Sequence, residues 1–161
     1  MAYVDCGFFL LFNSMTTSEA LQKLQRFCAY QERSPFEVER KLQQLGLPRD
    51  RHEEVVAQLM ADNFLDEYRF TEAFTRGKLN QKQWAPRRIR MGLQEHRIPR
   101  VTIDRILGQI DQDLVASNAR YLVERWFESK SKEKLTAALQ RRGYAFELIA
   151  STYDAVRNQR G

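Results

Sequence analysis

The residues best suited to chemistry in this chain are basic ones gathered in a single block. Residues 76–100 hold eight Lys and Arg residues and one acid, a local charge of +7 (8 − 1) in a chain whose net charge is +5. Lysine and arginine bind phosphates, and arginine also binds carboxylates through paired hydrogen bonds. The block therefore predicts a surface that contacts nucleic acid or an acidic protein. The candidate contact residues are Arg76, Lys78, Lys82, Arg87, Arg88, Arg90 and Arg97.

A basic run of this kind can also be a solvated helix face that binds nothing. A surface that serves solubility alone usually mixes both signs of charge, whereas the acids of this chain lie elsewhere. Residues 50–72 hold seven acids against two arginines. On a regular helix opened by Pro86, Arg87, Arg90 and Arg97 lie on one stripe, opposite Ile89. The charge separation favours the binding interpretation, and without base-reading or aromatic-stacking patterns, contact with nucleic acid would be blind to sequence.

Patterns of catalysis and metal binding are missing or weak. The sequence holds no glycine-rich phosphate loop, no GxSxG turn and no HExxH pair. Asp62, Asp66 and Glu67 could hold a divalent cation, as in a metal-dependent nuclease, but Asp66 and Glu67 also suit a helix N-terminus, where negative charge is favoured. His52 and His96 fall at or beside apolar positions, which predicts structural roles. We therefore expect no enzyme, no cofactor and no metal site.

The elements that must position the basic block are helices, because apolar residues recur every three or four positions along most of the chain. Thr16 and Glu19 have the spacing of a capping box. Ser34, followed by a proline, predicts a helix that stops at Gly46, and Pro86 opens another. A further helix is predicted over residues 48–62. Trp84 and Trp126, which precede two of these helices, are expected to fill the cores between helices.

The sequence pattern of one helix occurs three times in the chain. The stretches SPFEVERKLQQLGLP (34–48) and APRRIRMGLQEHRIP (85–99) share their prolines and their apolar frame, and residues 131–145 share the frame. The offsets are 51 and 46 residues, a period typical of helical repeat proteins. We predict an all-α protein in which three tandem three-helix repeats form an elongated, curved array. The expected divisions are an extension over 1–14 and repeats over 15–63, 64–112 and 113–161. The matching core positions are Val38, Ile89 and Leu135, then Leu42, Leu93 and Leu139.

The composition predicts a soluble cytoplasmic protein. Apolar residues make up 43% of the chain and charged residues 29%. The two cysteines, Cys6 and Cys28, have neither a disulfide framework nor a zinc spacing, which indicates reduced thiols. The apolar run 8–12 is far too short to span a bilayer. We expect a monomer that does not associate with membranes.

One segment of the sequence resembles a known family. The stretch FLDEYRFTEAFTRGK (64–78), followed by Trp84 and a basic helix, is similar to the central motif of the RecX family, the bacterial regulators of the RecA recombinase. The stretch RSPFEVERKLQQLGL (33–47) resembles the preceding unit of that family. The resemblance runs from about Glu19 to Val156 and is strongest in the middle; the last third matches only by its apolar frame.

The resemblance implies a regulator without catalytic activity. RecX proteins are elongated helical repeats that lodge in the groove of the RecA–DNA filament and inhibit ATP hydrolysis, strand exchange and filament growth. Membership would make the RecA filament the partner, with single- or double-stranded DNA contacted through its backbone. The alternative is a free-standing, sequence-nonspecific DNA- or RNA-binding helical repeat protein.

Overall fold

The computed structural model describes residues 15–161, so the predicted extension over 1–14 lies outside the described residues. Across the described part the chain is α-helical without a strand, which confirms the predicted fold class. The helices form three consecutive groups of three, called repeats 1, 2 and 3 below. Repeat 1 contains α1 (Thr17–Tyr30), α2 (Pro35–Leu45) and α3 (His52–Ala61); repeat 2 contains α4 (Glu67–Lys82), α5 (Pro86–Glu95) and α6 (Arg100–Leu107); repeat 3 contains α7 (Gln112–Trp126), α8 (Lys132–Arg141) and α9 (Phe146–Arg160).

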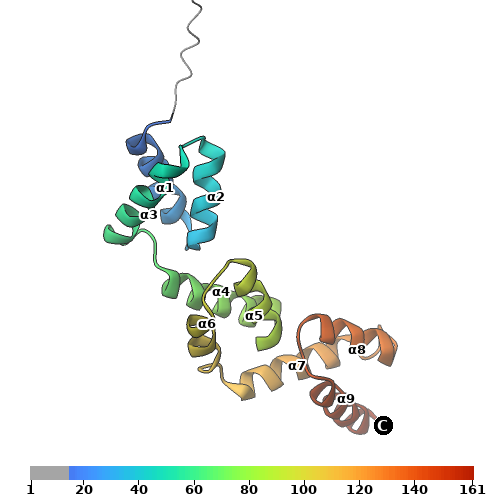
Figure 1. The fold of residues 1–161 in the computed structure, drawn as a ribbon. Helices are drawn as coiled ribbons and strands as arrows, with labels where there is room; N and C mark the ends of the chain where they lie inside the picture. Colours follow the sequence, from blue (N-terminus) through green and yellow to red (C-terminus); the bar gives the residue numbers. More distant parts are fainter. Residues whose placement is uncertain (1–14) are drawn as a thin grey trace, which may run out of the picture.

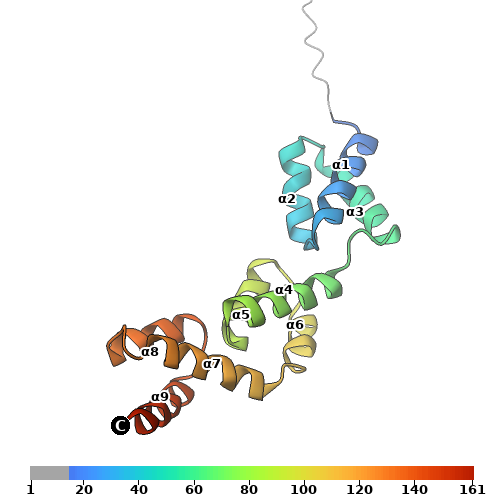
Figure 2. The same ribbon diagram turned by 180° about the vertical axis from the view of Figure 1, so that it is seen from behind.

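The three repeats follow one another along an elongated body, with repeat 1 at one end and repeat 3 at the other (Figure 1). The view from behind shows the same order (Figure 2). Each helix packs mainly on the two other helices of its own repeat. Within residues 15–161 no helix is both long enough and apolar enough to cross a membrane.

Local sequence signals set most of the helix ends. The Thr16 hydroxyl accepts a hydrogen bond from the Glu19 amide at 3.2 Å, and the Glu19 carboxylate accepts one from the Thr16 amide at 3.0 Å, which confirms the predicted capping box. Gly46 ends α2 in the left-handed conformation with φ of 75°. The prediction of one helix from residue 48 is wrong at its start, because residues 49–51 form a 3₁₀ turn before α3 begins.

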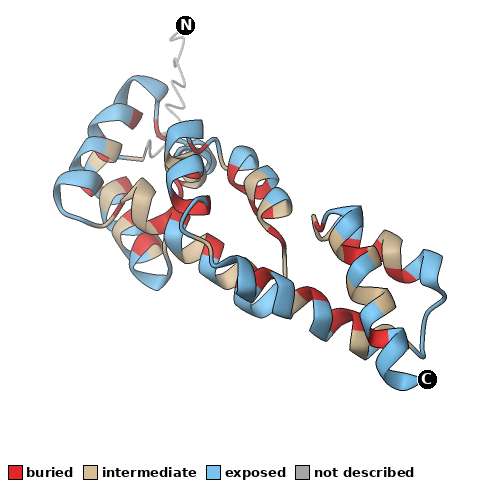
Figure 3. Ribbon diagram, turned by 90° about the horizontal axis from the view of Figure 1, so that it is seen from below, coloured by how far each residue is buried: buried red, intermediate tan, exposed pale blue. Residues whose placement is uncertain are grey.

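The buried residues form two separate cores, and they line the facing sides of the helices (Figure 3). Leu42 and its neighbours in repeat 1 form one core, whereas Leu93 and Leu139 belong to a single core that runs through repeats 2 and 3. The predicted apolar frame is confirmed, since Leu42, Leu93 and Leu139 are all 0% exposed. Repeats 2 and 3 are therefore joined by apolar packing, and repeat 1 is not.

Backbone contacts tighten the joint between repeats 2 and 3. The Ala85 amide donates to the Arg142 carbonyl at 2.8 Å, and the Tyr144 hydroxyl donates to the Gln83 carbonyl at 2.9 Å. Gly143 lies between them with φ of 90°, and a Cβ atom there would stand 2.5 Å from the Arg88 nitrogen. Only glycine fits this close approach without moving the backbone.

We predict that Tyr144 makes folding stability depend on pH in alkaline solution. Burial raises the pKa of Tyr144 to about 12, so the folded protein keeps a proton that the unfolded chain loses near pH 10. Stability should therefore fall as the pH rises from about 10 to about 12. Tyr144→Phe should cost about 0.5–1.5 kcal/mol at neutral pH, because the Gln83 carbonyl loses its donor, and should remove this part of the alkaline decline. Urea unfolding of both proteins across this range, with Tyr30→Phe at an exposed position as control, tests the prediction.

Candidate functional site

The seven predicted contact residues all belong to repeat 2 or to its turns. α4 carries three of them and α5 carries another three, while the seventh follows the end of α5. Four side chains are exposed and have no carboxylate within 4 Å among the described residues, and three of them, Arg76, Lys82 and Arg87, also lie over no aromatic ring. These three form the free part of the predicted surface.

Arg90 is not free, contrary to the prediction that the block lacks compensating acids. Its guanidinium donates to the carboxylate of Asp104 on α6, and Arg100 donates to the same carboxylate at 3.3 Å. The hydrogen bond from Arg90 is the main reason why the pKa of Asp104 lies below its usual range. The Arg90–Asp104 ion pair therefore connects α5 to α6, and Arg90 is less available to contact a partner.

Arg97 does not lie on the stripe predicted for it. α5 ends at Glu95, and Arg97 occupies the left-handed conformation with φ of 57° in the turn that follows. Its guanidinium lies over the ring of Phe36 at the start of α2, 4.3 Å from the ring centroid. The stacking directs Arg97 toward repeat 1, away from the row that Arg87 begins.

Lys78 and Arg88 lie against the indole ring of Trp84, a contact that the helical spacing alone does not predict. The Lys78 ammonium is 4.8 Å, and the Arg88 guanidinium 4.9 Å, from the ring centroid of Trp84. Arg142, from the turn after α8, lies in the same way over Trp126 at 4.8 Å. Both tryptophans are partly buried and pack against the shared core, as predicted. The structure thus adds Trp84 and Arg142 to the basic surface.

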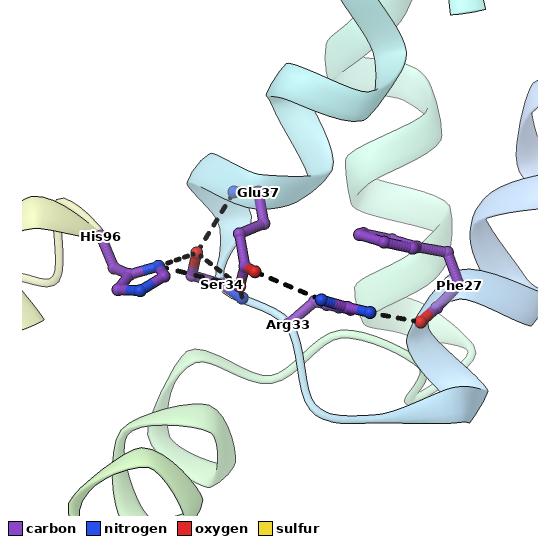
Figure 4. Close-up of polar contacts among 5 residues, drawn as sticks. All are labelled: Phe27, Arg33, Ser34, Glu37 and His96. Atoms are coloured by element: carbon purple, nitrogen blue, oxygen red, sulfur yellow. Dashed lines mark hydrogen bonds and ion pairs between the residues drawn. The ribbon is translucent and has the colours of Figure 1, made fainter. Parts of the chain in front are cut away.

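His96 forms the joint between repeats 1 and 2 (Figure 4). Its Nδ1 lies 3.2 Å from the hydroxyl of Ser34, the residue that caps α2, and 3.7 Å from the Glu37 carboxylate. The same Ser34 hydroxyl also lies 3.3 Å from the Glu37 carboxylate, so the three side chains form one polar cluster between the repeats. The ring packs on Phe70 and Phe74, with centroids 5.0 and 5.3 Å away. The structural role predicted for His96 is confirmed, and the contact residue Ser34 lies in the neighbouring repeat 1.

The acids considered as metal ligands are engaged by the protein itself. Asp66 caps α4 by accepting from the Arg69 amide at 2.8 Å, as predicted. Glu67 accepts from the Thr102 hydroxyl at 3.0 Å, and Asp62 from the Gln58 side chain at 2.9 Å. Residues 15–161 contain no group of three His, Cys, Asp or Glu side chains that could hold a metal ion.

His52, the other histidine, is buried, and its Nε2 lies 2.9 Å from the Leu47 carbonyl. The contact fixes the turn between α2 and α3. The structural role predicted for this residue is confirmed.

Comparison with known protein sequences identifies similar proteins that are described as RecX. Residues 66–107, which span α4 to α6, match the family described as the second three-helix domain of RecX. The regulatory protein RecX of Limosilactobacillus reuteri (strain DSM 20016) is 22% identical over 149 residues, covering 88% of this chain and 55% of the relative. RecX of Pseudomonas entomophila (strain L48) is 29% identical over 126 residues, covering 75% of this chain and 81% of the relative. The chain thus spans little more than half the length of several relatives that it matches.

Solved structures agree in fold. The crystal structure of RecX from Lactobacillus salivarius superposes with a TM-score of 0.75 at 20% identity, covering 88% of this chain and 96% of that one. A second RecX crystal structure superposes with a TM-score of 0.72, covering 88% of this chain and 71% of the other. The arrangement of three-helix repeats is therefore shared with both.

Proposed function

The chain belongs to the RecX family, and we propose that it is a non-enzymatic cytoplasmic regulator that binds the RecA–DNA filament. In this proposal it inhibits RecA ATPase, strand exchange and filament growth in DNA recombination and repair. It acts, in this proposal, by occupying a surface of the filament.

The observation that carries this proposal is the free part of the basic block on an elongated body. Arg76, Lys82 and Arg87 are exposed on the middle repeat and have no carboxylate partner among the described residues. A nucleoprotein filament offers phosphates from DNA and carboxylates from protein, and both bind such side chains. A long body that carries its charge in the middle can lie along a groove of the filament.

The test measures RecA ATPase on single-stranded DNA with and without this protein, and its binding to bare DNA in parallel. We expect ATP hydrolysis to fall as the protein is added. Unchanged hydrolysis at saturating concentrations of the protein would contradict the proposal.

A second candidate is a free-standing nucleic-acid-binding protein with no preference for the filament. The half-buried Lys78 and Arg88 beside Trp84 favour it, because cations next to an aromatic ring are common in single-strand binding surfaces. Tight binding to bare DNA without any effect on RecA would support this candidate over the first.

A further inference from the structure

Repeat 1 is connected to the body formed by repeats 2 and 3 through a very short link between α3 and α4 (Figure 1). The Leu65 amide donates to the Leu59 carbonyl at 3.1 Å, and the Leu65 side chain lies 2% exposed in the core of repeat 1. The next residue, Asp66, already caps α4 and therefore belongs to repeat 2. The two bodies thus meet at the peptide bond between Leu65 and Asp66, where rotation about the flanking backbone bonds can reorient them.

One side chain at the start of α4, Arg69, donates three hydrogen bonds to repeat 1. Its Nε donates to the Glu32 carboxylate at 2.5 Å, and its two terminal nitrogens donate to the Asn63 side chain at 2.9 Å and to the Asn63 carbonyl at 3.1 Å. Glu32 lies in the turn between α1 and α2, whereas Asn63 follows α3. Arg69 therefore attaches two separate turns of repeat 1 to the first turn of repeat 2.

The other side-chain contacts described for this joint are also polar or charged. His96 contacts Ser34 and Glu37, and the Arg97 guanidinium lies over the ring of Phe36 (Figure 4 shows the first of these). No core is shared across the joint, in contrast to the joint between repeats 2 and 3. Repeat 1 can consequently separate from repeat 2 without exposing either hydrophobic core to water.

The ion pair at the centre of this joint is within reach of solvent. The side chains of Arg69 and Glu32 are 37% and 31% exposed. Ion pairs that remain partly exposed stabilise a structure only weakly, because water and dissolved salt compete for both charges. The pair can therefore open and close reversibly while each body stays folded.

We propose that the Leu65–Asp66 link is a hinge and that Arg69 is the latch that holds repeat 1 in the observed orientation. When the bonds from Arg69 to Glu32 and Asn63 open, repeat 1 turns as a rigid body, since it has a core of its own. Repeats 2 and 3 do not turn against each other, because they share one core. The elongated body thus changes its curvature at one place, between the first and second repeats. The inference concerns the isolated protein and does not depend on its partner.

The test measures distances between spin labels by double electron–electron resonance, with Cys6 replaced by serine. One pair of labels, at Gln43→Cys and Gln140→Cys, spans the hinge from α2 to α8. A second pair, at Gln81→Cys and Gln140→Cys, lies within the body of repeats 2 and 3, and all three positions are exposed. Cys28 should stay unlabelled, because its thiol is buried and burial raises its pKa to about 11.

Arg69→Ala should broaden the distance distribution of the pair that spans the hinge and leave the other pair unchanged. The matched control is Arg90→Ala, which removes the same charge at nearly the same exposure, 36%, but breaks an ion pair with Asp104 inside repeat 2. The control should leave both distributions as they are in the parent. Added salt should broaden the spanning distribution of the parent, because it screens the latch.

Glu32→Ala keeps the test decisive if Arg69→Ala does not fold, since it removes the other partner of the ion pair from outside any helix. It should broaden the spanning distribution in the same direction, and combining the two changes should add little, because both open one contact. The proposal is overturned if the spanning distribution of Arg69→Ala or Glu32→Ala matches that of the parent. It is also overturned if Arg90→Ala broadens this distribution as much, or if the pair within repeats 2 and 3 broadens too, which would indicate local unfolding instead of a hinge.

Discussion

Reversing Arg76, Lys82 and Arg87 to glutamate should weaken binding to the RecA–DNA filament by roughly 100-fold or more. Hydrogen bonds to charged groups contribute about 1.5–3 kcal/mol each, and 1.4 kcal/mol corresponds to a factor of ten, so even partial contact at three exposed positions gives a loss of this size. The measurement is the concentration of protein that halves RecA ATPase on single-stranded DNA. The reversal also places three negative charges against the target, which adds repulsion.

The reversed protein should fold normally, because all three side chains are exposed and none takes part in an ion pair of the described residues. Circular dichroism and melting temperature should match those of the parent. A matched control reverses Lys23, Arg26 and Arg49, three exposed cations of repeat 1, and should keep most of the inhibition. If the first variant folds and still inhibits at parental concentrations, the basic block is merely solvated surface. If both variants lose inhibition equally, total charge matters and location does not.

Replacing Leu93 by alanine should cost about 2–5 kcal/mol of unfolding free energy. Leu93 is 0% exposed at the centre of repeat 2, and a deleted buried leucine leaves a cavity that a close-packed core fills only in part. Because repeats 2 and 3 share one core, both should be destabilised in the same transition. Denaturant unfolding measures the cost, and the partly exposed Leu114→Ala should cost about 0.5 kcal/mol or less.

Hydrogen exchange can show which helices Leu93→Ala destabilises. Amides of α4 to α9 should lose protection together, whereas those of α1 to α3 should keep theirs, since repeat 1 has its own core. The reciprocal variant Leu42→Ala should affect repeat 1 in preference. Equal loss of protection in all three repeats would contradict the division into two cores.

The helical frame could be predicted from the sequence because its causes are local. Capping residues, prolines at helix starts and apolar spacing act over four or five positions, which is why Thr16, Ser34 and Asp66 all cap helices where the sequence places them. The repeat itself adds independent agreement, since the same frame appears three times. Leu42, Leu93 and Leu139 are fully buried for this reason.

The details of the basic site could not be predicted because they depend on partners far away in sequence. Arg90 is paired with Asp104 on another helix, and the backbone carbonyl of Arg142 reaches the start of α5 from the next repeat. One signal was present: Arg97 occupies the repeat position that is glycine at 46 and 143, and all three residues have positive φ. Aligning the repeats by their turns as well as by their cores would have removed Arg97 from the predicted stripe.

The division into two cores has a consequence for synthesis on the ribosome. All buried partners of repeat 1 lie between Ala20 and Leu65, so this repeat has everything it needs to fold as soon as its own residues leave the exit tunnel. Repeat 2 differs, because Ile89 and Leu93 share their core with residues as late as Val156, near the end of the chain. Until repeat 3 has emerged, the side of this core that faces repeat 3 lacks its packing partners. The middle repeat, which carries the basic block, therefore completes its core only together with repeat 3, although it is made first.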